Sequence, residues 1–206
     1  MIKYRRMRNS ESEECVKLAT DAYFDYRYLT MYFPDDRKRR KFLESIMRLE
    51  IKLNKDSSYV ITAKKDGKLA ALALLSQPGH LRPSNIVYFM NGFLKTFFQC
   101  GIKDVINWIN MDSTAGIPCH TLQKGAWYLS SYLVNTSMQG EGIGSRFLQE
   151  CIIPFVKKKG GKKLCLFTNS EINRKFYRKN GFKEFHKQVF RYRGKSLGSW
   201  SYVMEL

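Results

Sequence analysis

A glycine-rich loop between a predicted strand and a predicted helix is the clearest place for ligand chemistry in this sequence. Residues 139–145 read Gln-Gly-Glu-Gly-Ile-Gly-Ser, with a glycine at every second position. Glycines lack a β-carbon, so backbone amides here can approach an anion closely, and the dipole of the following helix favours the same anion. The spacing differs from the P-loop and from the G-x-G-x-x-G of dinucleotide-binding folds. We therefore expect an anionic ligand at this loop.

The next predicted helix carries three side chains that could converge on one ligand. Asn169 or Ser170 can cap this helix, because a side-chain oxygen there accepts a hydrogen bond from a free backbone amide. Asn173, Phe176 and Tyr177 then fall at positions i, i+3 and i+4, so an amide, a ring and a phenol share one face. These three groups can therefore contact one bound ligand.

Taken together, the two segments carry a family resemblance. Residues 139–144 fit Q-x-x-G-x-G and residues 173–182 fit N-x-x-F-Y-x-x-x-G-F, and this pair closely resembles the signature of the GCN5-related N-acetyltransferase (GNAT) family, which binds acetyl-CoA. The resemblance covers residues 127–185 firmly and the rest of the chain through the order of its elements. The strand that begins at Trp127 and the helical insertion look most like the puromycin N-acetyltransferase-like group of that family.

The resemblance implies a role for each matching residue. Backbone amides of residues 139–145 would hold the CoA pyrophosphate, and the splayed strand end at Leu133 and Val134 would bind the pantetheine arm. Asn173 would contact the pantetheine, the amide of Val134 would stabilise the oxyanion, and Tyr177 would protonate the leaving thiolate. The full set of predicted cofactor-binding residues is Leu133, Val134, Gln139, Gly140, Glu141, Gly142, Ile143, Gly144, Ser145, Asn169, Asn173, Phe176 and Tyr177.

The sequence does not single out one residue as the general base. An amine nucleophile must lose a proton, which a side chain or a chain of water molecules can accept. His120, just before the central predicted strand, is the first candidate for a catalytic base beside Tyr177 as the acid. Glu50, Asp112 and the terminal carboxylate of Leu206 are the others.

Metal and disulfide chemistry are not expected. The three histidines are far apart and share no ligand spacing with the cysteines. Five cysteines are an odd number without a C-x-x-C pair, which favours reduced thiols in a cytoplasmic protein. The family resemblance implies acetyl-CoA as the cosubstrate, and no metal is expected.

The strands and helices expected from the sequence indicate a mixed α/β (α+β) fold that would position these residues. Strands are expected at residues 2–7, 59–64, 69–76, 127–134, 163–168, 182–192 and 199–206. Helices are expected from Ser10 or Ser12 to Tyr23 and at residues 35–53, 84–99, 103–111, 142–158 and 171–179, with Pro154 kinking or ending the fifth. We predict one domain over 1–206 with a helical insertion at about 81–120. Its GNAT-like fold would have a mostly antiparallel mixed sheet, flanked by helices and splayed at the acetyl-CoA site.

The composition and net charge of the chain limit the classes of partner that we expect it to bind. With 206 residues, 44% hydrophobic and 14% aromatic, the chain can bury the core of a folded domain. Its net charge of +18 favours anionic ligands, but no recognition helix or basic arm accompanies it, so no specific nucleic acid is expected. No apolar run is long enough to cross a bilayer and no signal peptide is recognisable, so we expect no membrane partner and a cytoplasmic monomer or homodimer.

The predicted function is transfer of an acetyl group from acetyl-CoA to a primary amine of a small molecule, by direct attack in a ternary complex. Two alternatives stay open: a catalytically silent CoA-binding sensor or partner module, and an acetyltransferase acting on a protein or peptide amine. A polybasic acceptor is disfavoured, because a surface of net charge +18 repels it.

Overall fold

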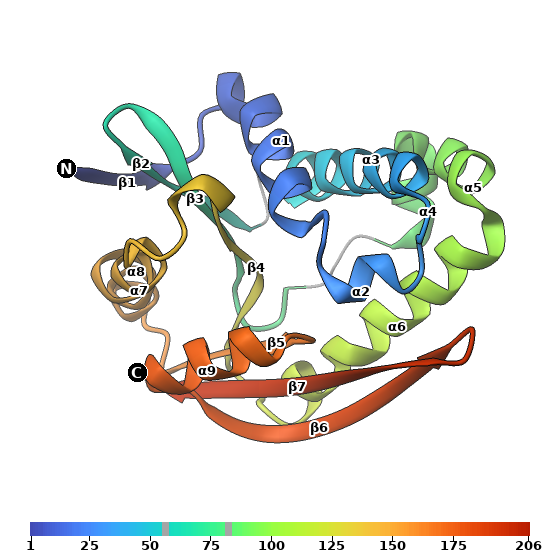
Figure 1. The fold of residues 1–206 in the computed structure, drawn as a ribbon. Coiled ribbons are helices and arrows are strands. Elements are labelled where there is room, and N and C mark those ends of the chain that lie inside the picture. The colour runs from blue at the N-terminus through green and yellow to red at the C-terminus, as the bar shows by residue number, and fades with distance from the viewer. Residues whose placement is uncertain (55–57, 81–83) are drawn as a thin grey trace.

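Seven strands form one sheet at the centre of the protein (Figure 1). The computed structural model describes residues 1–54, 58–80 and 84–206. The strands are β1 (Ile2–Arg6), β2 (Tyr59–Lys65), β3 (Lys68–Ser76), β4 (Trp127–Val134), β5 (Lys163–Thr168), β6 (Lys183–Tyr192) and β7 (Lys195–Glu205). Their order is β1-β2-β3-β4-β5-β7-β6, and only the β4–β5 pair is parallel. The predicted mixed, mostly antiparallel sheet is confirmed.

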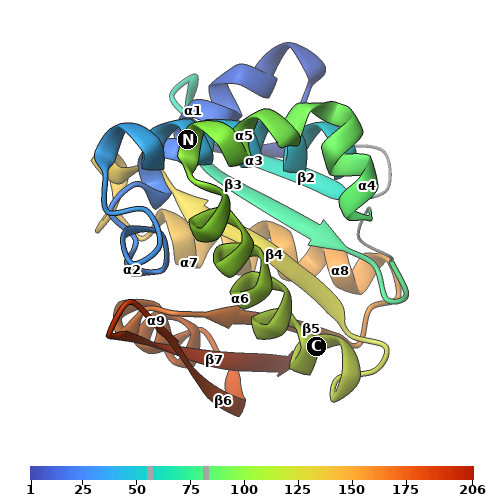
Figure 2. The same ribbon diagram turned by 90° about the vertical axis from the view of Figure 1, so that its right-hand side faces the viewer.

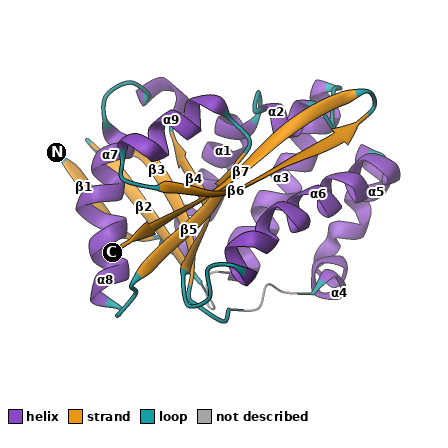
Figure 3. Ribbon diagram, turned by 90° about the horizontal axis from the view of Figure 1, so that it is seen from below, coloured by secondary structure: helices purple, strands orange, loops and turns teal. Residues whose placement is uncertain are grey.

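Helices cover both faces of this sheet (Figure 3). They are α1 (Ser12–Tyr23), α2 (Arg27–Thr30), α3 (Asp36–Asn54), α4 (Asn85–Tyr88), α5 (Leu94–Cys100), α6 (Ile102–Thr121), α7 (Ile143–Phe147), α8 (Ile153–Lys158) and α9 (Glu171–Lys179). One core holds buried side chains of α1, α3, α5 and α6, and a second core holds those of α7, α8 and α9. In the part of the chain that the structure describes, no helix is both long and apolar enough to cross a bilayer.

Two hairpins show where turn residues set the strand ends. Asp66 and Gly67 have φ of 50° and 80°, so the Asp-Gly turn between β2 and β3 is confirmed. Arg193 and Gly194 make the same kind of turn, with Tyr192 paired to Lys195. The predicted start of the last strand at residue 199 is therefore wrong. Gly198 lies within β7, where a β-carbon would come within 2.4 Å of the Trp200 ring, so it serves packing and not a loop.

The segment after β3 is helical but interrupted. The predicted helix over 84–99 consists of α4, a kinked turn at Phe89–Phe93, and α5. Gly92 breaks the helical path with a φ of 95°. The next helix, α6, runs to Thr121 and not to residue 111, since Pro118 and Gly116 are buried against the sheet. Figure 2 shows α6 crossing in front of the sheet toward β5 and β7. Of the predicted insertion, residues 81–83 lie outside the described residues.

Pro154 does not end the helix that follows the glycine loop. The chain stays helical from Ile143 through Lys158, but the turn at Leu148–Ile152 widens to a π-helical one. A wide turn of this kind accommodates the missing amide of a proline one or two residues later. The helix thus keeps the length expected from the sequence.

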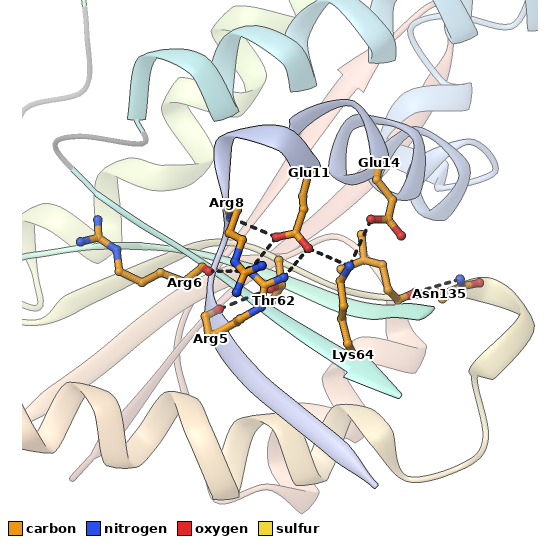
Figure 4. Close-up of polar contacts among 9 residues, drawn as sticks. Arg5, Arg6, Arg8, Glu11, Glu14, Thr62, Lys64 and Asn135 are labelled. Carbon is orange, nitrogen blue, oxygen red and sulfur yellow. Dashed lines mark hydrogen bonds and ion pairs between the residues drawn. The ribbon is translucent and has the colours of Figure 1, made fainter. Parts of the chain in front are cut away.

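Glu11 links β1 and β2 through contacts with side chains of both strands (Figure 4). Its carboxylate accepts hydrogen bonds from Arg5 Nη1 at 2.8 Å and from the Arg8 backbone amide at 3.0 Å, and it pairs with Lys64 Nζ at 2.7 Å. The side chain is only 9% exposed. The hydrogen bonds from Arg5 and Lys64 lower the pKa of Glu11 to about 2. The carboxylate is therefore strongly stabilised in the folded protein.

The low pKa of Glu11 predicts that the contribution of this residue to stability is lost in acid. An unfolded glutamate titrates near pH 4.3, so the stabilisation by Glu11 is complete above about pH 5 and is lost as the pH falls toward 2. Glu11→Gln is expected to lower the free energy of unfolding by about 2–3 kcal/mol at pH 7, and by progressively less below pH 5. Urea unfolding at several pH values measures this difference.

Glu13→Gln is the matched control for that experiment. Glu13 pairs with Arg48 at 2.8 Å, but its side chain is 71% exposed. Exposed pairs contribute about 0–1 kcal/mol, so the control is expected to change stability little at any pH. An equal loss in both variants at pH 7, or a loss in Glu11→Gln that does not depend on pH, would contradict the role of Glu11.

Candidate active site

The parallel strands β4 and β5 separate soon after they meet. Their register holds only two pairs, Trp127 with Leu164 and Tyr128 with Cys165, although β4 continues to Val134 and β5 to Thr168. On its other edge β4 has a bulge, because Leu74 pairs with Ser131 while Leu75 pairs with Leu129. The sheet therefore opens into a wedge at the carboxyl ends of β4 and β5, and the predicted splay is confirmed.

A cavity of about 510 Å³ fills this wedge. Its walls come from β4, the end of β5, α9, the α1–α2 segment, α3, α6 and the end of β3. Aromatic side chains make up much of the lining: Tyr23, Tyr26, Tyr28, Trp108, Tyr128, Tyr132, Phe167 and Tyr177. Such a cavity is large enough for a small organic molecule.

The glycine loop lies beside the wedge and precedes α7. Gly140 and Gly142 have φ of 85° and 74°, with open space where a β-carbon would stand. Gly144 serves packing instead, because its β-carbon would lie 3.3 Å from the Phe176 ring and 3.4 Å from Val134. The first two glycines thus set the path of the loop, and the third lets α9 approach α7.

Contacts from neighbouring strands hold the loop in place. Lys65 of β2 forms an ion pair with Glu141, and Gln139 Nε2 donates to the Val134 carbonyl at 3.4 Å. The Tyr132 hydroxyl donates to the Gly144 carbonyl. Because Tyr132 also lines the cavity, this hydrogen bond links the loop to the wedge.

The structure brings part of the predicted cofactor set to the cavity. Asn169, Asn173 and Tyr177 line it, whereas the nearest β4 residues in the lining are Tyr128 to Tyr132 and not Leu133 or Val134. Leu133 is buried in the core formed with α1, α3, α5 and α6. The Phe176 ring packs on Tyr132 with a centroid distance of 6.1 Å. Ser145 Oγ accepts a hydrogen bond from Asn180 Nδ2 at 3.2 Å, which fixes the start of α7 against the end of α9.

Tyr177 lines the cavity, and its phenol is shielded from solvent. Its side chain is buried, with ring centroids 5.2 Å from Phe176 and 5.4 Å from Phe182. Burial raises the pKa of Tyr177 well above its usual value near 10. The phenol therefore stays protonated through the range in which enzymes work, as a proton donor requires.

Tyr26 is a site residue that sequence reasoning missed. Its hydroxyl lies 2.8 Å from Thr168 Oγ1 and accepts hydrogen bonds from the Asn169 amide at 3.3 Å and Asn173 Nδ2 at 3.1 Å. The residue belongs to the segment between α1 and α2, about 140 residues away in sequence. No motif surrounds it, so only the tertiary structure shows that it closes the wedge.

Removing the Tyr26 hydroxyl should loosen this end of the cavity. Tyr26→Phe leaves Thr168, Asn169 and Asn173 without one partner each, which is expected to lower the free energy of unfolding by about 1–3 kcal/mol. Thermal unfolding measures the loss. Tyr32→Phe is the control, since Tyr32 is a buried tyrosine that stacks on Tyr192 at 4.9 Å outside the cavity. A smaller loss in Tyr26→Phe than in this control would contradict the assignment.

Three of the four candidate bases lie at the cavity. His120, Glu50 and Asp112 line it. Glu50 accepts a hydrogen bond from the Tyr88 hydroxyl at 2.7 Å, and Asp112 accepts one from Tyr28 at 3.1 Å. The backbone amide of Leu206 instead donates to Lys162 at the opposite end of β5, and Leu206 is not among the lining residues.

The cysteines are poorly placed for covalent chemistry. All five are free thiols, and neither Cys151 nor Cys165 lines the cavity. Burial raises the pKa of Cys151 to about 11, and Cys165 Sγ contacts the Cys119 carbonyl at 3.6 Å. A thiolate nucleophile requires the opposite environment. Among the described residues, no group of three or more histidine, cysteine or acidic side chains is arranged to hold a metal.

Known proteins share this architecture. The chain is similar to the polyamine N-acetyltransferase of Drosophila melanogaster, at 13% identity over all of both chains and a TM-score of 0.64. A mutant of agmatine N-acetyltransferase aligns over 100% of this chain and 99% of that one, at 12% identity and a TM-score of 0.66. An N-acetyltransferase from Staphylococcus aureus Mu50 aligns over 100% and 98%, at 17% identity and a TM-score of 0.58.

Sequence comparison gives the family. No curated protein matches the chain. The profile of the acetyltransferase (GNAT) family matches residues 14–182, which include the glycine loop, the wedge between β4 and β5, and Tyr177. The chain therefore belongs to the GNAT family of acetyltransferases.

Proposed function

We propose that this protein transfers an acetyl group from acetyl-CoA to a primary amine of a small molecule, inside the cavity between β4 and β5. The observation that carries the proposal is the continuity of the site. The loop at residues 139–145 is joined through Tyr132 to a cavity that also holds the buried phenol of Tyr177. A glycine-rich loop, a cavity and a buried phenol thus adjoin one another.

The residues present fit acetyl-CoA. Positive φ angles at Gly140 and Gly142, with open space around both, leave the loop backbone accessible to a pyrophosphate. Beyond Tyr128, β4 has no β5 partner, so its backbone can pair with the amides of a pantetheine arm. Leu133 and Val134 at the end of that strand, and Asn173 across the wedge, would hold the arm.

The chemistry follows from the groups that face the cavity. The amine nitrogen attacks the thioester carbonyl, an N–C bond forms, and the C–S bond breaks as the CoA thiolate leaves. Tyr177 gives its proton to that thiolate, while backbone amides of β4 stabilise the oxyanion. His120, Glu50 or Asp112 accepts the proton that the amine nitrogen loses, directly or through water. No enzyme–acetyl intermediate is required.

A small acceptor suits the size of the site. A cavity of about 510 Å³ has room for the thioester end and a compact amine. Proteins of the same fold act on polyamines and agmatine, which are small amines. The likeness to the puromycin N-acetyltransferase-like group is a second guide to acceptors worth testing.

Release of free CoA thiol tests the proposal. The purified protein is incubated with acetyl-CoA and a panel of small primary amines, and thiol is followed colorimetrically. We expect acceptor-dependent release, with a higher kcat/KM for at least one small amine than for a polylysine peptide. Binding of CoA without release for any amine would instead indicate a silent CoA-binding module, and preference for the peptide would indicate a protein acceptor.

A further inference from the structure

The helical segment after β3 exposes an apolar stripe that the catalytic function does not use. Six large apolar residues recur at intervals of four: Ile86, Met90, Leu94, Phe98, Ile102 and Ile106. All six are exposed, Met90 by 82% and Phe98 by 74%. We call this set the insertion stripe. Single exposed apolar residues are common, but six on one segment of the chain indicate an interaction surface.

The stripe lies on an outer edge and not in a groove. α4 and α5 lie at the margin of the molecule, next to α3 and away from the sheet (Figures 1 and 3). Figure 2 shows α5 and α4 running along one border of the molecule. Phe93 and Phe97 of the same segment are buried in the core, so the segment is held from behind while the stripe faces outward. A projecting helical edge fits a broad flat surface.

Positive charge predominates around the stripe. Residues 84–103 contain Lys95 and Lys103, both exposed, and no aspartate or glutamate. The end of α5 also adjoins the basic start of α3, where Cys100 Sγ contacts the Lys38 carbonyl at 3.5 Å. The side chains of Lys38 and Lys41 are exposed there, as are those of Asp35 and Asp36, of which Asp36 is paired with Arg39 at 2.5 Å. Asp104, the first carboxylate after this stretch, is paired with Arg193 at 2.7 Å.

The exposed apolar residues and the positive charge around them indicate which kind of partner binds the insertion stripe. A second copy of the chain would bring another net charge of +18 to a basic face, which opposes association. An anionic bilayer offers the complementary charge, and exposed apolar side chains flanked by lysines are a common means of interfacial binding.

We propose that the insertion stripe docks the protein on the surface of an anionic lipid bilayer, with Met90 and Phe98 entering the interface and Lys95 and Lys103 contacting lipid phosphates. α6 then connects the membrane with the active site, because it carries Ile102 and Ile106 at one end and lines the cavity with Asp112, Gly116 and His120 further along. The cavity thus remains next to the lipid surface during catalysis.

Vesicle flotation tests this docking. The full-length protein is mixed at physiological salt with vesicles of phosphatidylcholine containing about one third phosphatidylserine, and with vesicles of phosphatidylcholine alone. We expect the wild type to float with the anionic vesicles at least tenfold more than with the neutral ones. Met90→Ser together with Phe98→Ser is expected to reduce flotation on anionic vesicles at least tenfold, because two apolar contacts are lost.

Val189→Ser is the matched control, since Val189 is 55% exposed on β6 and lies outside the stripe. It is expected to float like the wild type, and all variants are expected to keep the wild-type melting temperature. Equal flotation of wild type and double variant would refute the role of the stripe and leave only general charge attraction. A dimer in sedimentation that the double variant abolishes, without flotation, would identify a second copy as the occupant instead.

Discussion

Replacing Tyr177 with phenylalanine is expected to lower kcat by about 10²–10³-fold and to change the KM for acetyl-CoA by less than about twofold. Phenylalanine keeps the ring packed against Phe176 and Phe182 but removes the proton that the leaving thiolate needs. Because the pKa of Tyr177 is raised far above 10 by burial, wild-type kcat should show no alkaline decline from this group up to about pH 9. Steady-state kinetics over a range of pH measures both effects.

Tyr202→Phe is the matched control for this experiment. Tyr202 is a buried tyrosine 6.1 Å from Tyr177, but its hydroxyl donates to Glu184 and does not line the cavity. Its loss should affect stability and leave kcat within about threefold. If Tyr177→Phe retained more than a third of the wild-type kcat, Tyr177 would be a packing residue and a water molecule would protonate the thiolate.

The second large effect is expected at the glycine loop. Gly140→Ala together with Gly142→Ala should raise the KM for acetyl-CoA by about 30- to 100-fold with a smaller change in kcat. Left-handed backbone costs a residue with a β-carbon roughly 1–2 kcal/mol, so the loop would relax and its amides would turn away from the pyrophosphate. Initial rates at varied acetyl-CoA, together with calorimetric titration of CoA, measure the loss.

The chain offers a control with the same backbone strain. Gly125 and Gly160 have φ of 79° and 77°, no atom within 4 Å of a β-carbon, and positions outside residues 139–145. Gly125→Ala together with Gly160→Ala should lower stability by a similar amount and leave the KM for acetyl-CoA unchanged. If both double variants raised the KM equally, strain alone would explain the effect and the loop would have no special role.

Local patterns predicted most of the fold. Alternating apolar residues, the Asp66-Gly67 turn and the glycine before α7 each give a strong signal within a few residues, and the sheet and most helices follow. Errors arose where tertiary packing overrides local preference. Gly198 allows close approach of Trp200 within a strand, and Pro118 sits inside α6 because the sheet supports that end of the helix.

Only part of the candidate site could be predicted from local sequence patterns. Residues 139–145 and Tyr177 belong to local motifs, so they can be predicted as site residues from the sequence alone. Tyr26 and the bulge at Ser130 depend on contacts between distant segments and carry no motif. For the base, the structure places three of the four candidates at one cavity, which no spacing in the sequence could indicate.

The central claim is direct transfer from acetyl-CoA to the amine within one ternary complex, and a two-substrate rate experiment tests it most directly. Initial rates are measured while acetyl-CoA and an accepted amine are both varied, and the protein is then analysed by mass spectrometry after exposure to acetyl-CoA alone. The account predicts intersecting double-reciprocal lines and an unmodified protein. Parallel lines with an acetylated cysteine would contradict it, because they require a covalent intermediate that the buried thiols should not form.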